Sequence, residues 1–292
     1  MSASGMRHAL APASDSKLSA RLTARRDGFQ YEVWRDGAKL RYRVSRGDES
    51  FETALAWAFG SGHTGQTWVF ERDGRWIETR VSHYPSIQGL DLTVGAANAA
   101  PASLDEAIGR PMSAADAKEC FGCHTTQSAE PASFRPGLEC GACHGPAAPH
   151  LEALRKGSGT AMPNPGRASS EEISEFCGQC HRTWEQVMLM GVRGINTIRF
   201  QPYRLTLSKC YDAGDRRASC VACHDPHKPA ARSARDYDRA CLACHTQLNP
   251  CKSGASGECA SCHMPKLELP GAHTKFTDHR IRVARPGEPF PD

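Results

Sequence analysis

Polar and apolar residues alternate in two stretches of the first hundred residues. FQYEVW and KLRYRV flank the turn sequence RDGA within residues 28–48, and QTWVFE and RWIETRVSHY flank a second Asp-Gly pair at 73–74. A period of two over about four to eight residues is typical of strands that bury one face, and Asp-Gly favours a tight hairpin turn. The pattern therefore predicts two β-hairpins in a small β-rich domain over residues 1–100.

Helix-start signals appear beyond the uncharged, Ala-rich stretch VGAANAAPAS at 94–103, which is typical of a linker. Each signal places a Ser three residues before an acidic residue, the pattern of a capping box. The pairs are Ser113 with Asp116, Ser169 with Glu172, and Ser233 with Asp236. Each Ser precedes a cysteine by seven or eight residues. We therefore expect an α+β fold, in which a mostly α, loop-rich domain over residues 101–292 follows the β-rich domain.

GSGHTG at residues 60–65 matches the Gly-x-Gly-x-x-Gly pattern of dinucleotide-binding loops. Such a loop lies between a strand and a helix, and the helix N-terminus binds the pyrophosphate. Here the strand-like QTWVFE follows the glycines in place of a helix. The sequence therefore favours a glycine-rich turn.

The composition points to a chain with a small apolar core. Hydrophobic residues make up 39% of the 292 residues, and the chain holds 26 Gly and 19 Pro. The longest apolar candidate, VMLMGV, is far too short to span a bilayer, so no transmembrane segment is expected. The formal charge of +4 comes without a run of Lys and Arg, so no nucleic-acid partner is expected.

Cysteine dominates the second part of the chain, since all 14 cysteines lie between residues 120 and 262. Such a density is typical of thiols that hold a metal or a cofactor. Twelve of them form the motif Cys-x-x-Cys-His, which occurs six times, each motif beginning 18 to 43 residues after the start of the one before it. The motif residues are Cys120, Cys123 and His124; Cys140, Cys143 and His144; Cys177, Cys180 and His181; Cys220, Cys223 and His224; Cys241, Cys244 and His245; and Cys259, Cys262 and His263.

Cys-x-x-Cys-His is the attachment signature of c-type haem. Its two thiols form thioethers with the haem, and the adjacent His becomes the proximal ligand of the iron. On a helix the first Cys and the His share one face, because they are four positions apart. Four-cysteine zinc sites or disulfides would also use the cysteine pairs, but neither explains a His after every pair. The motif therefore predicts six covalently attached haem c groups.

Histidines outside the motifs are candidates for the distal position on the irons. Six of the thirteen histidines are proximal, which leaves seven for six irons. The distal candidates are His150, His227, His273, His279, His63 and His83. We expect His150 and His227, which closely follow the second and fourth motifs, to reach the iron of a neighbouring haem. His273 and His279 lie in a polar tail, GAHTKFTDHR, that we expect to cross the last haems.

Haem binding also gives roles to residues outside the ligand set. Each porphyrin brings two propionates, so the oxidised holo-protein is about six charges more negative than the polypeptide. The candidate propionate partners are Arg199, Arg204, Arg216 and Arg217, with a solvated surface role as the alternative. Cys210 and Cys251 lie outside the motifs. A disulfide between them, two free thiols or an intermolecular bridge all fit the sequence.

The haem part resembles multihaem c-type cytochromes, in particular the doubled-motif group akin to the tetrahaem cytochromes of ammonia oxidation. The strings that carry the resemblance are CGACHGPAAPH, RFQPYRLTLSKC, SCVACHDPHK, and CASCHMPK followed by FTDHRIR. GSGHTGQTWVFERDGRWIETRVSHYP is similar to the haem-free domain that often precedes them, so the resemblance covers most of residues 50–285. It implies closely packed haem pairs, bis-His ligation at most irons and electron transfer, with His150 and His227 as the best matches to the family's distal ligands.

These features predict a multihaem cytochrome that passes electrons along a chain of six closely packed, mostly bis-His haems. We expect an electron carrier rather than an enzyme, and redox proteins as its partners. One alternative is a haem enzyme that reduces or oxidises a small nitrogen or sulfur compound at one open haem. Another is a subunit of a conductive filament, in which His8 or His279 completes an iron of a neighbouring copy.

The expected location is periplasmic or extracellular, because haem c is attached outside the cytoplasm. The opening residues MSASGMRHALAPASDSKLSARL contain no apolar segment of the kind found in a secretory signal. We therefore expect a start that was trimmed or that lies further upstream.

Overall fold

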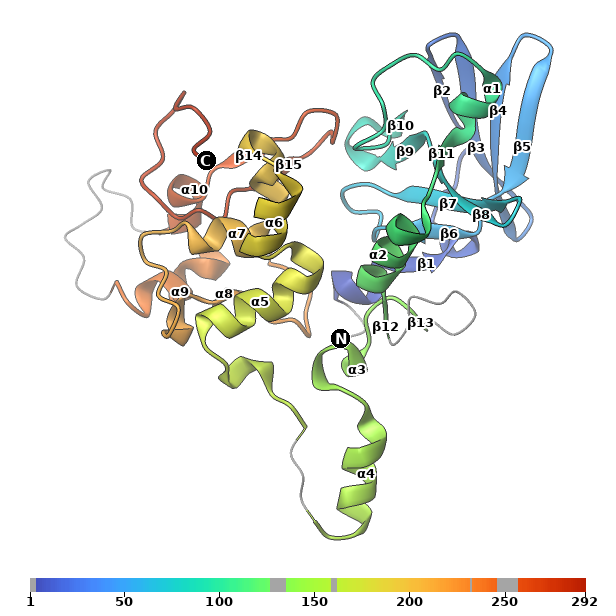
Figure 1. The fold of residues 1–292 in the computed structure, drawn as a ribbon. Coiled ribbons are helices and arrows are strands. Elements are labelled where there is room, and N and C mark those ends of the chain that lie inside the picture. The colour runs from blue at the N-terminus through green and yellow to red at the C-terminus, as the bar shows by residue number, and fades with distance from the viewer. Residues whose placement is uncertain (1–3, 127–134, 159–161, 232, 246–256) are drawn as a thin grey trace. The chain divides into compact units, whose positions relative to one another are not determined.

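The computed structural model describes residues 4–126, 135–158, 162–231, 233–245 and 257–292 (Figure 1). The chain divides into two compact units. The β-rich unit comprises residues 5–142 and 270–274, and the helical unit comprises Ser4, residues 143–269 and residues 275–292. The fold is α+β, as the sequence predicts.

A four-stranded antiparallel sheet begins the β-rich unit, in the strand order β2-β3-β4-β5. The strands are β2 (Leu22–Arg26), β3 (Phe29–Asp36), β4 (Lys39–Arg46) and β5 (Glu49–Ala54). Tyr31 pairs with Val44 across β3 and β4, which confirms the first predicted hairpin. The alternating positions of these strands bury Tyr31, Val33, Leu40, Tyr42 and Val44.

A second sheet has the strand order β1-β6-β7-β8-β11 (Figure 1). Its strands are β1 (Leu10–Pro12), β6 (Trp57–Phe59), β7 (Thr67–Arg72), β8 (Arg75–Thr79) and β11 (Gly109–Pro111). A two-stranded sheet of β9 (Val81–Tyr84) and β10 (Gly89–Leu92) follows. The pairing of β7 with β8 around Asp73-Gly74 confirms the second predicted hairpin.

The glycine-rich string lies in the loop between β6 and β7, with a strand on each side. Gly60 has a φ of +93°, and a Cβ there would lie 2.7 Å from the carbonyl oxygen of Gly65. Glycine is therefore required by the turn itself, because L side chains rarely adopt this conformation. The predicted turn is confirmed, and the helix that a dinucleotide loop needs is absent from this described segment.

The β-rich unit continues past residue 100, where the sequence places the domain boundary. Two short helices, α1 (Leu104–Ile108) and α2 (Ala114–His124), bury Ile108 and Phe121 against the sheets. The Phe121 ring lies 5.2 Å from that of Phe59. Strands β12 (Thr125–Thr126) and β13 (Arg135–Pro136) complete the unit, which therefore includes the first Cys-x-x-Cys-His motif.

Short helices joined by long loops make up the helical unit. The helices that follow β13 are α3 (Cys140–His144), α4 (Ala147–Arg155), α5 (Ser170–His181), α6 (Trp184–Met190), α7 (Gln201–Thr206), α8 (Cys220–Cys223), α9 (Asp238–Leu242) and α10 (Cys259–His263), and the hairpin of β14 (Lys266–Glu268) and β15 (Lys275–Thr277) follows them. Val187, Phe200 and Tyr203 form a small apolar cluster around α6 and α7. No helix among the described residues is both long and apolar enough to cross a membrane.

Two of the three predicted capping boxes are confirmed. Ser113 and Ser169 accept hydrogen bonds from the N3 backbone N–H groups, and the N3 carboxylates of Asp116 and Glu172 accept from the cap residues in return. The box at Ser233 is wrong, because Ser233 Oγ accepts instead from Arg235 N, 3.2 Å away. Residues 234–237 form a 3₁₀ helix, whose tighter turn brings that earlier N–H group to the cap.

Candidate cofactor-attachment sites

All six Cys-x-x-Cys-His motifs form a helical turn. Four of them lie wholly within helices, namely α2, α3, α5 and α10. In the other two, His224 N donates to Cys220 O at 2.8 Å and His245 N donates to Cys241 O at 3.0 Å. Each motif therefore presents its first cysteine and its histidine on one face, as attachment to a single porphyrin requires.

Backbone carbonyls orient the proximal histidines of three motifs. His124 Nδ1 donates to Ala9 O at 2.7 Å, and His144 Nδ1 donates to Pro163 O at 2.8 Å. His263 Nδ1 lies 2.8 Å from Arg282 O in the same way. A histidine that binds a metal through one ring nitrogen usually donates its other N–H to such an acceptor. These bonds place the proton of each ring on Nδ1 and fix the orientation of the ring.

Two motif histidines each face a predicted distal histidine. The rings of His144 and His227 have centroids 6.1 Å apart and planes 5° apart. The rings of His224 and His279 have centroids 6.2 Å apart and planes 35° apart. The structure thus brings a distal candidate to the second motif and another to the fourth.

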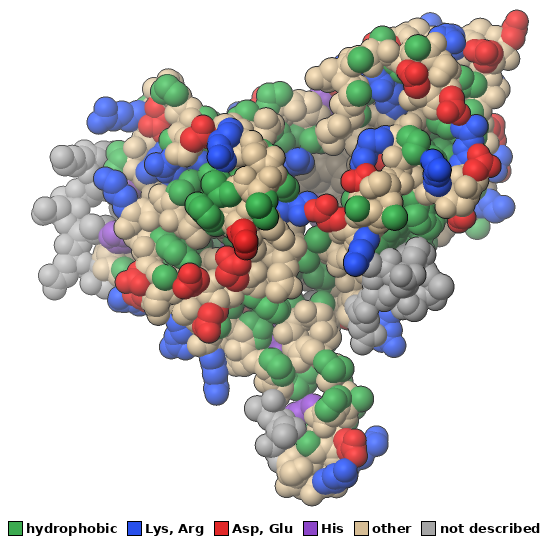
Figure 2. Space-filling model, in the orientation of Figure 1, with side chains coloured by type: hydrophobic (Ala, Val, Ile, Leu, Met, Phe, Trp, Pro, Cys, Tyr) green, Lys and Arg blue, Asp and Glu red, His purple; other side chains and the backbone are tan. Residues whose placement is uncertain are grey.

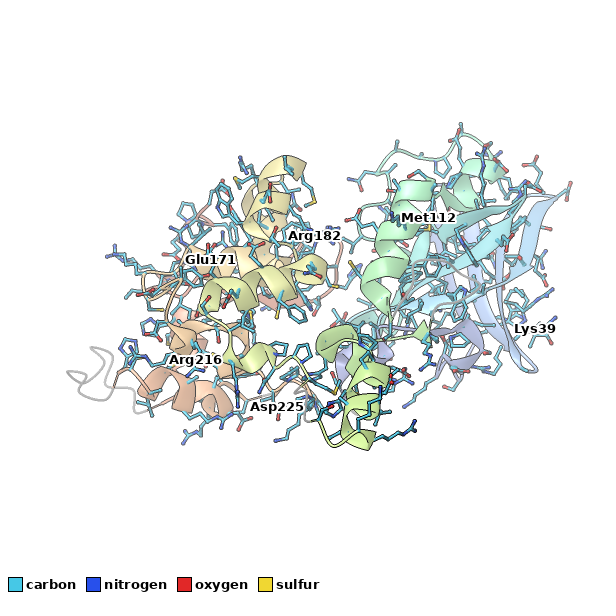
Figure 3. All side chains as sticks on the ribbon, turned by 60° about the horizontal axis from the view of Figure 1, so that its bottom comes forward. Lys39, Met112, Glu171, Arg182, Arg216 and Asp225 are labelled. Atoms are coloured by element: carbon cyan, nitrogen blue, oxygen red, sulfur yellow. The ribbon has the colours of Figure 1, made fainter. Side chains whose placement is uncertain are left out.

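Local bonds also fix Nδ1 of both distal candidates. Asp225 Oδ1 accepts from His227 N at 3.0 Å and lies 3.2 Å from His227 Nδ1 (Asp225 is labelled in Figure 3). His279 Nδ1 donates to Thr277 O at 2.9 Å. Burial lowers the pKa of His279 to about 4, so its ring is neutral near pH 7. A neutral imidazole is the form that binds metals.

The other distal candidates lie elsewhere. His150 is half-buried in α4, and His63 is exposed in the loop before β7. His83 lies in β9 with its backbone paired to Gln66, and burial lowers its pKa. His273 lies in the β-rich unit, where its Nε2 is 2.7 Å from Asp91 Oδ2. In this structure, therefore, the Nε2 atom of His273 is already engaged by a carboxylate.

Cysteines of different motifs lie close together in pairs. The thiols of Cys177 and Cys220 lie close enough to shift each other's pKa, and Cys259 shifts the pKa of Cys241 in the same way. The third motif thus adjoins the fourth, and the fifth adjoins the sixth. The sequence gives no signal for these contacts, since the motifs in each pair are separated by loops.

The thiols of Cys120 and Cys259 lack the character of catalytic nucleophiles. Burial raises the pKa of Cys120 to about 11, and burial together with a hydrogen bond to Asp238 raises that of Cys259 to about 11. Reactive cysteines have a lowered pKa, because the thiolate is the nucleophile. These cysteines are therefore protonated near pH 7.

A cavity of about 870 Å³ lies in the helical unit between the fourth and fifth motifs. Small residues of the two motif regions line it, namely Val221, Ala222, Ala240 and Ala243. Arg216, Arg217 and Arg239 line it as well (Arg216 is labelled in Figure 3). Apolar walls with guanidinium groups suit a flat, apolar ligand that carries carboxylates. Arg217 is also bound to Asp215, with Nη2 2.6 Å from Oδ2, and this bond lowers the pKa of Asp215 to about 2.

The remaining predicted propionate partners differ from one another. Arg199 is exposed, and desolvation by neighbouring protein atoms together with the positive charge of Arg182 lowers its pKa. Arg204 is neither solvated nor open to a propionate, because its side chain is fully buried and Nε donates to Asp278 Oδ1 at 2.9 Å. Asp278 is a residue that the sequence analysis missed, although it directly precedes the candidate His279.

The predicted pairing of Cys210 with Cys251 lies partly outside the described residues. Cys251 is among the residues that the structure does not describe, so its pairing with Cys210 is not tested.

Within the described ranges, no group of three or more His, Cys, Asp or Glu side chains stands in an arrangement that could hold a metal ion.

Comparison with known proteins gives one weak likeness. No family model matches the chain, and no curated protein matches it. Among solved structures, the chain is similar to the "Outer Cell Wall Cytochrome OcwA", with 16% sequence identity and a TM-score of 0.48. The alignment covers 78% of this chain and 68% of that chain. A likeness of this degree establishes neither a family nor a function.

Proposed function

We propose that the protein is a multihaem c-type cytochrome that transfers electrons through six covalently attached haem c groups. The observation that carries the proposal is that two motif histidines each face a histidine from outside the motifs. The ring centroids are 6.1 Å apart for His144 and His227 and 6.2 Å apart for His224 and His279. The six helical Cys-x-x-Cys-His turns support the same conclusion.

The spacing of the two histidine pairs fits ligands on opposite faces of one metal ion. An imidazole nitrogen binds a metal at about 2.0–2.1 Å, and the ring centroid lies about 1.1 Å behind that nitrogen, so two opposed imidazoles have centroids about 6.3 Å apart. The measured separations of 6.1 and 6.2 Å agree with this value. The residues present therefore fit a haem iron with two axial histidines at the second and fourth motifs.

Each part of the site has a defined role in this proposal. The motif cysteines would attach the haem through thioethers, and the carbonyl-bound histidines would supply Nε2 as a ligand. Bound haem c supplies reversible one-electron exchange between ferric and ferrous iron. Arg216, Arg217 and Arg239 offer positive charge to the propionates at the cavity between the fourth and fifth motifs. His150, His63, His83 and His273 remain predictions as ligands of the other irons.

Close packing of motifs supports transfer along a chain rather than at one centre. The thiol contacts of Cys177 with Cys220 and of Cys241 with Cys259 bring two pairs of attachment points together. Porphyrins attached at adjoining sulfur atoms have neighbouring edges, which favours electron hopping between them. We expect redox proteins as partners and a periplasmic or extracellular location, where haem c is attached.

Intact mass and electron paramagnetic resonance of the oxidised protein test this function together. The expected mass exceeds that of the polypeptide by six haem groups, and the expected spectrum is dominated by low-spin ferric iron. A colourless protein, or one with the mass of its amino acids alone, would contradict the proposal. A strong high-spin signal at one iron would instead favour a haem enzyme with an open distal face.

A further inference from the structure

A buried ion pair fixes the C-terminal segment of the helical unit. The side chains of Arg204 in α7 and Asp278 after β15 are both fully buried. Arg204 donates from Nε to Asp278 Oδ1 at 2.9 Å and from Nη2 to Asp278 Oδ2 at 3.0 Å. A bidentate pair of this kind fixes orientation as well as distance.

Arg282 extends the ion pair into a network without net charge. Arg282 Nη1 donates to Asp278 Oδ2 at 2.7 Å, and Arg282 Nε donates to Glu288 Oε1 at 2.9 Å. Two guanidinium groups and two carboxylates are thereby connected in one chain. Removal of one charge from such a network leaves another group buried and unpaired, so the network specifies one arrangement of the segment.

This segment carries contacts to two different haem sites. His279 directly follows Asp278, and its ring lies 6.2 Å from that of His224. Four residues beyond Asp278, Arg282 O accepts from His263 Nδ1 at 2.8 Å, and Arg282 N donates to His263 O at 3.1 Å. A displacement of residues 278–282 therefore moves both a distal candidate of the fourth motif and the acceptor that orients the proximal histidine of the sixth.

We propose that Asp278 is a positioning residue for two irons at once, holding the distal His279 of the fourth haem and, through Arg282, the proximal His263 of the sixth. The proposal rests on the proposed function, because it presumes haem at both motifs. Asp278 acts through the backbone and through Arg282, and it ligates neither iron. The irons of the other four motifs are independent of it.

Ser208 provides a second, milder way to loosen the same segment. Its Oγ accepts from Ile281 N at 2.8 Å and donates to His279 O at 3.2 Å. Loss of these two bonds loosens the backbone at residues 279–281 but leaves the ion network in place. Ser208→Ala therefore addresses the segment without exposing a buried charge.

The test compares Asp278→Asn with Asp105→Asn in the full-length, haem-loaded protein. Asp105 pairs with Arg72 at 2.6 Å on the surface of the β-rich unit and serves as the matched control. For Asp278→Asn we expect six haems by intact mass, loss of the low-spin resonance signal of one iron, a new high-spin signal, and recovery with added imidazole. We also expect a shift in the reduction potential of a second iron. Asp105→Asn leaves all signals unchanged.

An Asp278→Asn protein with the wild-type resonance spectrum and unchanged reduction potentials would overturn the proposal. If Asp278→Asn does not accumulate as folded protein, Ser208→Ala carries the test through the same measurements, with smaller potential shifts confined to two irons. Unchanged potentials in Ser208→Ala, together with faster hydrogen exchange in residues 278–282, overturn the proposal as well, because the segment then moves without affecting either iron. A wild-type protein without haem mass contradicts the proposed function itself, which keeps the two failures distinct.

Discussion

The β-rich unit buries a continuous apolar cluster between its sheets, whereas the apolar cluster of the helical unit consists of Val187, Phe200 and Tyr203. The helical unit fills its interior differently, with the buried ion pair of Arg204 and Asp278. On the face shown in Figure 2, Lys and Arg are interspersed with Asp and Glu over both units. On this face the surface charges therefore do not distinguish the two units, but the interior does. The interior of the β-rich unit is complete in polypeptide, and under the proposed function porphyrin faces would complete that of the helical unit.

Histidines show the same contrast. In the β-rich unit, Nε2 of His273 is already bound, at 2.7 Å from Asp91 Oδ2. In the helical unit, the Nδ1 atoms of His227 and His279 lie against nearby oxygen atoms, and their rings face motif histidines. Local bonding thus distinguishes a histidine whose Nε2 is engaged from two that are placed to serve as the proposed ligands.

The largest expected effect comes from the chain made without haem attachment. We expect the β-rich unit to fold in such a chain and the helical unit to remain unfolded, because only the former has a sufficient apolar core. Limited proteolysis followed by mass spectrometry measures this. Fragments should retain residues 5–126 and be cut throughout residues 162–245.

The haem-loaded protein under the same protease is the control, and we expect both units to resist cleavage there. Protection of the helical unit in the chain without haem would show that polypeptide contacts alone hold it. The idea that the helical unit, unlike the β-rich unit, lacks a sufficient apolar core of its own would then be wrong.

Loss of a core side chain should affect the β-rich unit without touching the irons. The Trp68 side chain is 0% exposed, so Trp68→Ala leaves a large cavity and should lower the free energy of unfolding of this unit by about 3–5 kcal/mol. Chemical denaturation monitored by circular dichroism measures the loss, and haem absorbance is expected to stay unchanged. Trp68→Phe is the milder comparison, because Nε1 of Trp68 has no hydrogen-bond partner to lose.

Local signals made most of the elements predictable. Alternation and Asp-Gly turns specify the hairpins of β3 with β4 and of β7 with β8 because strand and turn are neighbours in sequence. The capping boxes at Ser113 and Ser169 and the helical turns of the motifs are local in the same way. At Ser233 the same local rule failed, because the backbone closes into a 3₁₀ turn instead.

Contacts between distant residues were not predictable from the sequence. Asp238 caps the sixth motif from 20 residues away, accepting from Glu258 N at 2.7 Å and from Cys259 N at 2.8 Å. Arg204 pairs with Asp278 across 74 residues. The sequence predicts a propionate as the partner of Arg204 because nothing near Arg204 in the chain points to Asp278. Neither pair has a periodicity or a motif that a single sequence could reveal.

Removal of one distal candidate tests whether a histidine that faces a motif histidine binds iron. His227→Ala should convert one iron from low-spin to high-spin and leave the other five unchanged, because His227 faces His144 at the second motif. Electron paramagnetic resonance of the oxidised protein measures this conversion. His273→Ala is the comparison, and we expect it to keep every low-spin signal while weakening the attachment of residues 270–274 to β10. A high-spin iron in His273→Ala would mean that His273 leaves Asp91 to bind haem.

The smallest expected effect compares the helix caps of the two units. Ser113→Ala and Ser169→Ala each remove a capping box and should each cost about 1 kcal/mol. Hydrogen exchange should locate the first loss in residues 114–124 and the second in residues 170–181. Ser233→Ala should cost less, because Ser233 caps only a 3₁₀ turn. If haem attachment at Cys177 holds α5 more firmly than its cap does, the loss in Ser169→Ala is smaller than about 1 kcal/mol. A loss of the full size in the haem-loaded protein would show that α5 is stabilised by its own cap.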